Sequence, residues 1–305
     1  AIGYQTLISE DGNGRNVAVG TSALQTQNTG SDVYNVGVGY FAGYAITTGA
    51  NNTLIGGLAG DALTTGGLNT AVGFASLTSS TTAANNTALG YAALNAATTG
   101  ASNVAVGSSA GVAVTTGAAN TLIGGNAGDA LTEASYNVAL GKNALSADTL
   151  GSKTIAIGYG ALDTQNFTSA TDTYNVAVGH NTGTAVTTGT LNTLIGGLAG
   201  DALTTGNSNT ALGYQALSAD TTGDRSTALG FQALAVQNFT TNTDTYNTAV
   251  GYNSGLSVTT GVQNTLIGGL AGVSLTTGQE NIAIGYAALD ADDQGKGSIA
   301  IGVNA

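Results

Sequence analysis

Polar and apolar positions along this chain follow one short motif that recurs from end to end. An Asn is followed by Thr, Val or Ile, then Ala, Leu or Gly, then Ile, Val or Leu, and finally Gly, as in Asn52-Thr53-Leu54-Ile55-Gly56. A fixed period in the sequence is the signature of a repeat architecture. The motif begins at Asn16, Asn35, Asn52, Asn69, Asn86, Asn103, Asn120, Asn137, Thr154, Asn175, Asn192, Asn209, Ser226, Asn247, Asn264, Asn281 and Ser298, mostly at intervals of 17 residues. Residues 1–305 are therefore predicted to form a single β-solenoid repeat array, a fragment that starts and ends mid-repeat.

Alternation within the motif predicts a short strand whose second and fourth residues face one side and whose third residue faces the other. The fourth residue is aliphatic in every motif, as at Val38 and Ile55, so we expect it to face the core. The third residues, such as Leu54 and Ala71, are then expected to form a second apolar face that needs covering by a partner.

A second short strand is predicted in the stretch that follows, which ends in Thr-Thr-Gly, and the Gly after the fourth position is expected to turn the chain at positive φ. Two strands and two turns per 17 residues predict one coil of an all-β, parallel β-solenoid. In this stretch the coils are of two kinds, with Gly before a large aliphatic residue (Gly60 and Leu63) or Leu before a small one (Leu94 and Ala97). Because interiors are closely packed, we interpret this exchange as compensation of volume in the core.

Three coils are longer than the others, and their extra residues fall at the same place. The long stretches are residues 165–174 and 237–246, with a shorter relative at residues 27–34. Insertions in solenoids often form the binding face, although a solvated corner loop is the simpler alternative. The candidate surface-contact residues are Asn166, Phe167, Asp172, Tyr174, Asn238, Phe239, Asp244 and Tyr246.

The amino-acid composition argues against several classes of partner and of catalytic centre. Only 7% of residues are charged, and 5 Lys and Arg against 17 Asp and Glu give a net charge of -12, which argues against nucleic acid as a partner. The chain has no Cys and a single His, His180, so no catalytic centre built on a thiolate or on two imidazoles is expected. No apolar run approaches the length of a membrane helix. We therefore expect no enzyme activity, no cofactor, no metal site and no membrane insertion in this segment.

Repeated polar residues suggest ladders. The Asn at the head of each motif is expected to bond to the coils above and below it. The recurring Thr pairs, such as Thr64-Thr65, are expected to form a hydroxyl ladder along one edge, which leaves an ice-binding solenoid as an alternative function. A glycan-processing fibre enzyme is a second alternative, since paired acids such as Asp292-Asp293 occur. Gly56 to Asp61 is close to a calcium-binding nonapeptide but has Ala59 where that motif has Gly, so a solvated acidic face is the preferred interpretation.

Some motifs resemble a known family. Asn103-Val104-Ala105-Val106-Gly107 and Ser298-Ile299-Ala300-Ile301-Gly302 resemble the coil motif of YadA-like trimeric autotransporter adhesin heads, and residues 209–217 are similar to repeats of phage tail fibres. The resemblance implies a left-handed parallel β-roll, a side-by-side homotrimer or filament, and a place outside the cell, on a cell surface or on a virion. The 17-residue period is longer than that of the adhesin heads. The expected function is a non-catalytic structural fibre segment of an adhesin or tail fibre that mediates attachment to a host or cell-surface ligand, with glycans as one candidate class.

Overall fold

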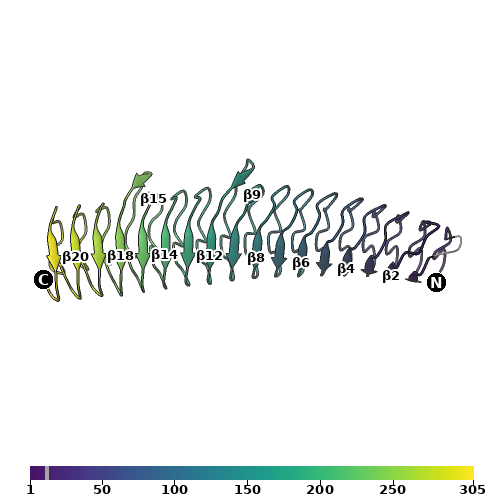
Figure 1. Cartoon of the computed structure of the whole chain (residues 1–305), viewed down its shortest axis with the longest axis horizontal. Coiled ribbons are helices and arrows are strands. Elements are labelled where there is room, and N and C mark those ends of the chain that lie inside the picture. Colours follow the sequence, from purple (N-terminus) through teal and green to yellow (C-terminus); the bar gives the residue numbers. More distant parts are fainter. Residues whose placement is uncertain (11–13) are drawn as a thin grey trace. The chain divides into compact units, whose positions relative to one another are not determined.

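The computed structural model describes residues 1–10 and 14–305, which fold as an all-β, parallel β-solenoid of short strands and turns without a helix. The chain divides into two compact units. Unit 1 comprises residues 1–152 and 168–171, and unit 2 comprises residues 153–167 and 172–305. In each unit successive coils lie on top of one another, with their strands side by side (Figure 1).

Each coil contributes one strand of three residues. In unit 1 these strands are β1 (Val17–Val19), β2 (Val36–Val38), β3 (Thr53–Ile55), β4 (Thr70–Val72), β5 (Thr87–Leu89), β6 (Val104–Val106), β7 (Thr121–Ile123) and β8 (Val138–Leu140). In unit 2 they are β10 (Ile155–Ile157), β12 (Val176–Val178), β13 (Thr193–Ile195), β14 (Thr210–Leu212), β16 (Thr227–Leu229), β18 (Thr248–Val250), β19 (Thr265–Ile267), β20 (Ile282–Ile284) and β21 (Ile299–Ile301). Four two-residue strands lie outside these columns: β9 (Gly151–Ser152), β11 (Thr171–Asp172), β15 (Gly223–Asp224) and β17 (Thr243–Asp244).

Neighbouring strands within a unit pair in parallel and without a shift of register. Between β3 and β4, for example, Thr53 lies opposite Thr70 and Ile55 lies opposite Val72. Equivalent residues of successive coils therefore stack in columns, at the spacing of about 4.8 Å that separates paired strands. A property repeated in the sequence becomes a continuous stripe along the unit.

The strand faces the core with its third motif residue, not with its fourth. Leu54 and Ala71 are fully buried, whereas Ile55 is 39% exposed. The predicted core face is therefore wrong, and the second apolar face that needs covering is not formed by the third residues. The reason is space. A Cβ atom at Gly60 would lie 2.8 Å from Cδ1 of Leu63 and 2.9 Å from Cδ2 of Leu54, so one Leu per strand already fills the narrow interior.

The predicted second strand is also wrong, because the stretch after the motif Gly has alternating signs of φ. Leu58 and Gly60 have φ of 59° and 55°, which no β-strand adopts. This turn region still bonds to the next coil, since Gly60 N–H donates to the carbonyl of Ser76 at 2.9 Å and Thr64 N–H donates to that of Thr81 at 2.9 Å. The turn at the motif Gly is confirmed, because Gly56 has φ of 135°.

The expected exchange of volume in the core is confirmed. In coils of the first kind, Gly43 and Gly60 leave room for Ile46 and Leu63, which are fully buried. In coils of the second kind Leu94 occupies the Gly position and is itself fully buried, opposite a buried Ala97. Both kinds of coil thus fill the same interior with differently placed side chains.

Both expected ladders are present. Asn103 is fully buried; its Nδ2 donates to the carbonyl of Gly117 at 2.9 Å, and its Oδ1 accepts from Asn120 N–H at 3.0 Å. In the second ladder the hydroxyl of Thr64 donates to the carbonyl of Thr81 at 3.1 Å, and that of Thr98 to the carbonyl of Thr115 at 3.2 Å. Both ladders tie neighbouring coils together through groups that the strands alone would leave unpaired.

Candidate functional site

The candidate contact site of unit 2 consists of the second long-coil loop, residues 237–246, and of the parts of the first loop that belong to this unit, residues 165–167 and 172–174. The second loop carries β17, which pairs in parallel with β15 of the preceding coil. Figure 1 shows β15 projecting from the edge of the stacked coils of unit 2. The two-stranded sheet of β15 and β17 therefore positions the side chains on this edge.

The two Phe residues predicted as surface contacts support the loops instead. Phe167 and Phe239 are only 6% and 7% exposed. Phe239 N–H donates to Oδ1 of Asp220 at 3.2 Å, and its carbonyl accepts from the hydroxyl of Thr222 at 2.7 Å. These aromatic residues anchor the start of each loop, and most of the loop residues that follow them are exposed to solvent.

Below the second loop lies a buried polar network. Gln237 Nε2 donates to Oδ2 of Asp220 at 2.6 Å and to the hydroxyl of Ser226 at 2.8 Å, and that hydroxyl lies 2.6 Å from the hydroxyl of Thr245. Asn247 Nδ2 donates to Oε1 of Gln237 at 2.8 Å. Burial raises the pKa of the Asp220 carboxyl above its ordinary value, opposed by the hydrogen bond from Gln237 and by those from backbone N–H groups. Such a satisfied network fixes the base of the loop.

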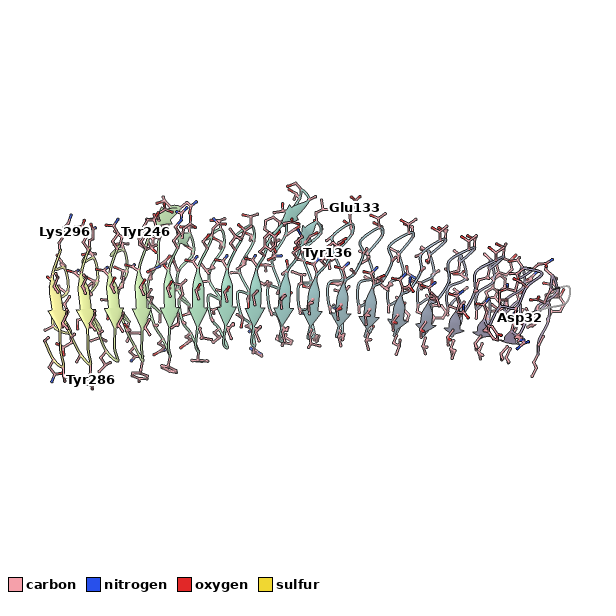
Figure 2. All side chains as sticks on the ribbon, viewed as in Figure 1. Asp32, Glu133, Tyr136, Tyr246, Tyr286 and Lys296 are labelled. Carbon is pink, nitrogen blue, oxygen red and sulfur yellow. The ribbon has the colours of Figure 1, made fainter. Side chains whose placement is uncertain are left out.

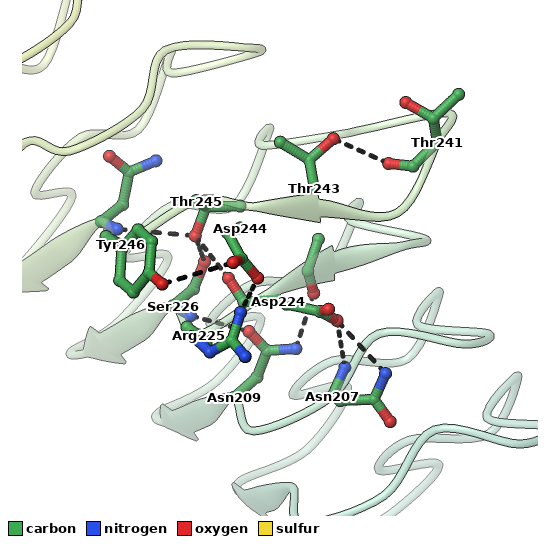
Figure 3. Close-up of polar contacts among 12 residues, drawn as sticks. Asn207, Asn209, Asp224, Arg225, Ser226, Thr241, Thr243, Asp244, Thr245 and Tyr246 are labelled. Carbon is green, nitrogen blue, oxygen red and sulfur yellow. Dashed lines mark hydrogen bonds and ion pairs between the residues drawn. The ribbon is translucent and has the colours of Figure 1, made fainter.

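At the outer edge, Arg225, Asp244 and Tyr246 form an exposed cluster (Figure 3). The Arg225 guanidinium pairs with Oδ1 of Asp244 and lies 5.7 Å from the centre of the Tyr246 ring. The Tyr246 hydroxyl donates to Oδ2 of Asp244 at 3.3 Å. One cation thus holds both the carboxylate and the aromatic ring of the long coil against the coil before it.

The first long coil of unit 2 repeats this cluster with Lys153, Asp172 and Tyr174. Lys153 Nζ donates to Oδ2 of Asp172 at 2.6 Å and to the Tyr174 hydroxyl at 3.1 Å, and it lies 5.1 Å from the ring centre. The hydrogen bond to Asp172, and then that to Tyr174, raises the pKa of Lys153 to about 12. In unit 1, Arg15 pairs with Asp32 at 3.2 Å and lies 5.8 Å from the ring of Tyr34.

Sequence reasoning did not include these cations among the site residues. A usable signal was present, because three of the five basic residues stand directly before a motif and one coil ahead of a long coil: Arg15, Lys153 and Arg225. The remaining predicted residues, Asn166 and Asn238, are exposed, and their backbone N–H groups donate to the carbonyls of Thr187 and Thr259. The structure therefore brings Asp and Tyr of each loop together and separates them from the buried Phe.

Other candidate positions lie elsewhere. His180 is exposed and stacks on Tyr159 with ring centres 5.2 Å apart. Over residues 1–10 and 14–305 no group of three or more His, Cys, Asp or Glu side chains is placed to hold a metal ion. The same residues form no pocket, and none of their elements is a helix able to cross a bilayer.

A scan against protein-family models finds no model that matches this chain, and comparison with curated proteins and with solved structures finds no match either.

Proposed function

We propose that this chain is a non-catalytic structural fibre segment of an extracellular adhesin or phage tail fibre, which attaches to a surface through the exposed clusters of its long coils. The observation that supports the proposal is repetition. Coils stacked in strict register extend a protein in one direction, and a cluster of one Lys or Arg, one Asp and one Tyr recurs at each long coil. In unit 2 the two clusters lie four coils apart, about 19 Å at the usual strand spacing.

The fibre role includes a side-by-side homotrimer. The outward strand face of unit 2 carries two columns of Thr, Val, Ile and Leu, without a charged residue, and Leu212 and Ile267 on it are 46% and 38% exposed. A continuous uncharged surface with one full column of exposed or half-exposed aliphatic side chains is typical of an interaction surface. Packing these faces against one another about a common axis would remove them from water.

The assembly is tested by placing charge on this face. The double variant Ile195→Lys and Ile267→Lys should convert a trimer into monomers, because it would place six ammonium groups in a dry interface. The matched control, Thr188→Lys and Thr260→Lys, adds the same charge on the exposed edge of the Thr pairs and should stay trimeric. Mass photometry measures the change, and a wild-type monomer at micromolar concentration would show that the segment does not assemble in this way.

Attachment is tested on the exposed Tyr residues alone, since deleting a whole loop would also remove the buried Phe. The variant Tyr174→Ser and Tyr246→Ser is compatible with the fold, because Ser102 and Ser208 occupy the same place in other coils. We expect at least a tenfold loss of fluorescently labelled protein bound to intact bacterial cells, measured by flow cytometry. The control is Tyr136→Ser, which removes a ring that is 64% exposed, against 51% for Tyr174 and Tyr246, from a coil without a long loop. Equal loss in both variants would contradict a role for the loops.

A further inference from the structure

On the edge of unit 2 opposite the long-coil clusters, aromatic rings follow the motif Gly in most coils. Figure 2 shows Tyr246 and Lys296 on one edge and Tyr286 on the other. We call this set the ring column: Tyr159, His180, Tyr214, Phe231, Tyr252 and Tyr286. Tyr214, Phe231 and Tyr252 are 48%, 41% and 58% exposed, with successive ring centres 5.7 Å and 5.4 Å apart and planes within 21° of parallel. A continuous row of exposed aromatic rings is typical of a surface that binds a ligand or a partner.

Two glycines interrupt the ring column and leave ring faces open. A Cβ atom at Gly197 would lie 3.6 Å from Cδ2 of Tyr214, and one at Gly269 would lie 3.6 Å from Cδ2 of Tyr286. These are ordinary van der Waals distances, so a side chain would fit at either position and would cover the ring. Neither Gly is needed for a positive φ. A Gly next to a ring of the following coil also occurs in unit 1, where a Cβ atom at Gly57 would lie 3.3 Å from Cδ2 of Phe74.

Amide side chains run beside the rings. Asn181, Gln215, Gln232 and Asn253 each follow a residue of the ring column. Gln232 Nε2 donates to Oε1 of Gln215 at 2.8 Å, which fixes the two amides relative to the rings of Tyr214 and Phe231. Amides both donate and accept hydrogen bonds, so this surface combines apolar faces with groups able to pair with hydroxyls.

Charge selects the class of ligand. From residue 180 to residue 287 neither the ring column nor the adjacent amide column contains Asp, Glu, Lys or Arg, although the chain carries a net charge of -12. An anionic ligand would be repelled by the chain as a whole, and a cationic ligand would find no carboxylate in the two columns. The face of an aromatic ring is electron-rich and attracts weakly positive C–H groups. An uncharged ligand with C–H faces and many hydroxyls meets all of these conditions.

We propose that the ring column of unit 2 binds a neutral polysaccharide, with sugar rings packed on the open faces of Tyr214 and Tyr286 beside Gly197 and Gly269. The two glycines lie four coils apart, about 19 Å along the column. An extended polymer lying along the column contacts both positions, which raises its affinity over that of a single sugar. The inference extends the proposed attachment role to a second edge and stands on different residues, so the two can fail separately.

Native affinity electrophoresis tests this proposal, with hydroxyethyl cellulose or galactomannan in the gel as neutral polymers and carboxymethyl cellulose as the anionic one. The wild-type chain should be retarded by a neutral polymer and not by the anionic one. The variant Tyr214→Ser and Tyr286→Ser should weaken retardation at least tenfold; Ser108 already occupies this column in unit 1. The variant Gly197→Thr and Gly269→Thr keeps both rings but covers their faces, and it should weaken retardation similarly.

Tyr136→Ser, which removes an exposed ring outside both the ring column and the long-coil clusters, is the control and should migrate as the wild type does. Circular dichroism checks that each variant keeps the fold. The proposal is overturned if neither neutral polymer retards the wild type, if only the anionic polymer does, or if both ring-column variants bind as strongly as the wild type. It is also overturned if the ring-column variants change the oligomeric state, because the column would then be a contact between copies.

Discussion

At the scale of the residue, the motif Gly and the Gly that follows it in some coils have different surroundings. The motif Gly turns the strand at a φ near 135°, and the carbonyl of the next coil's Gly occupies the place where its Cβ atom would be. The Gly one residue later is less crowded: the nearest atom to a Cβ atom at Gly125 would lie 4.0 Å away, and at Gly197 3.6 Å away. Two adjacent glycines that look alike in the sequence therefore differ in how strictly the fold requires them.

Substitutions at these two positions should have different effects on the free energy of unfolding. In Gly107→Ala the new Cβ atom would lie 2.5 Å from the carbonyl oxygen of Gly124 at a φ of 140°, so we expect a loss of about 1–3 kcal/mol in the free energy of unfolding. In Gly125→Ala the nearest atom would lie 4.0 Å away, and stability should change by less than about 0.5 kcal/mol. Urea denaturation measures both, and equal effects would contradict the stacking geometry.

Asp220 gives a prediction that depends on pH. Its two carboxylate oxygens accept from Gly223 N–H, Phe239 N–H and Gln237 Nε2, so Asp220→Asn would set an amide N–H₂ against the amide donor of Gln237. The expected cost is about 1–3 kcal/mol, the penalty for an unsatisfied buried group.

Burial raises the folded-state pKa of Asp220 above its ordinary 3.8, so the folded chain binds more protons than the unfolded chain between 3.8 and the raised value. The wild type should therefore gain stability relative to Asp220→Asn as the pH falls through that window. Urea denaturation of both proteins from pH 7 to pH 5, above the pH at which the chain loses its net charge, measures the difference, in which contributions from the other carboxyls cancel. A difference that stays constant or shrinks toward pH 5 would contradict the raised pKa.

At the scale of the element, a strand of only three residues offers few hydrogen bonds, so each coil depends on side chains that bond to the backbone of its neighbours. The Asn ladder supplies two such bonds per coil at the buried corner where the strand begins. Where Thr154 or Ser226 replaces Asn, the coil is a long one, and Thr173 or Thr245 of that coil contributes an additional hydroxyl. In these two coils a hydroxyl from the long loop therefore bonds to the residue that replaces Asn at the buried corner.

Removing one step of the Asn ladder should destabilise unit 1. Asn103→Ala leaves the carbonyl of Gly117 and the N–H of Asn120 buried without these partners, and each such group costs about 1–3 kcal/mol. The neighbouring exposed residue provides the control, because Ser102→Ala should be nearly neutral; Ala119 already occupies that place one coil later. Urea denaturation would contradict the ladder's role if both variants unfolded at the same concentration.

At the scale of the whole molecule, the charged residues are few and strongly unbalanced. Because each copy of the chain carries a net charge of -12, copies repel one another at neutral pH. Their exposed strand faces and ring columns, which carry aliphatic and aromatic side chains, favour association. Attraction between the apolar faces and repulsion between the charges therefore oppose one another in every encounter between copies.

This balance predicts association between copies of the chain near the isoelectric point. At about pH 4.1 the net charge vanishes, and we expect light scattering to rise steeply while circular dichroism still reports the folded β-structure. At pH 7, salt near 1 M, which screens charges beyond roughly 3 Å, should produce a smaller rise. A solution that remains clear at pH 4.1 would show that the exposed faces are not the source of attraction.

The sequence by itself determined the repeat, the parallel stack and the ladders, because a fixed period places equivalent residues in columns whatever the shape of the coil. Asn103, Thr64 and Gly56 were assigned correctly for this reason: each bonds or turns against its own copy in the next coil. The long coils were also located from the sequence, since an insertion breaks the period.

Only the tertiary structure decided which side of the strand is inside. Leu54 and Ile55 are equally apolar, and alternation alone gives two faces without saying which one the rest of the coil closes on. The narrow interior holds Leu54 beside Gly60, or Ala71 beside Leu77, and the column of invariant aliphatic residues, such as Ile55, lies outside. The tertiary structure likewise decided that Phe239 is buried and that Arg225 holds Asp244 and Tyr246, because these contacts join residues of different coils whose side-chain directions depend on the path of the turn.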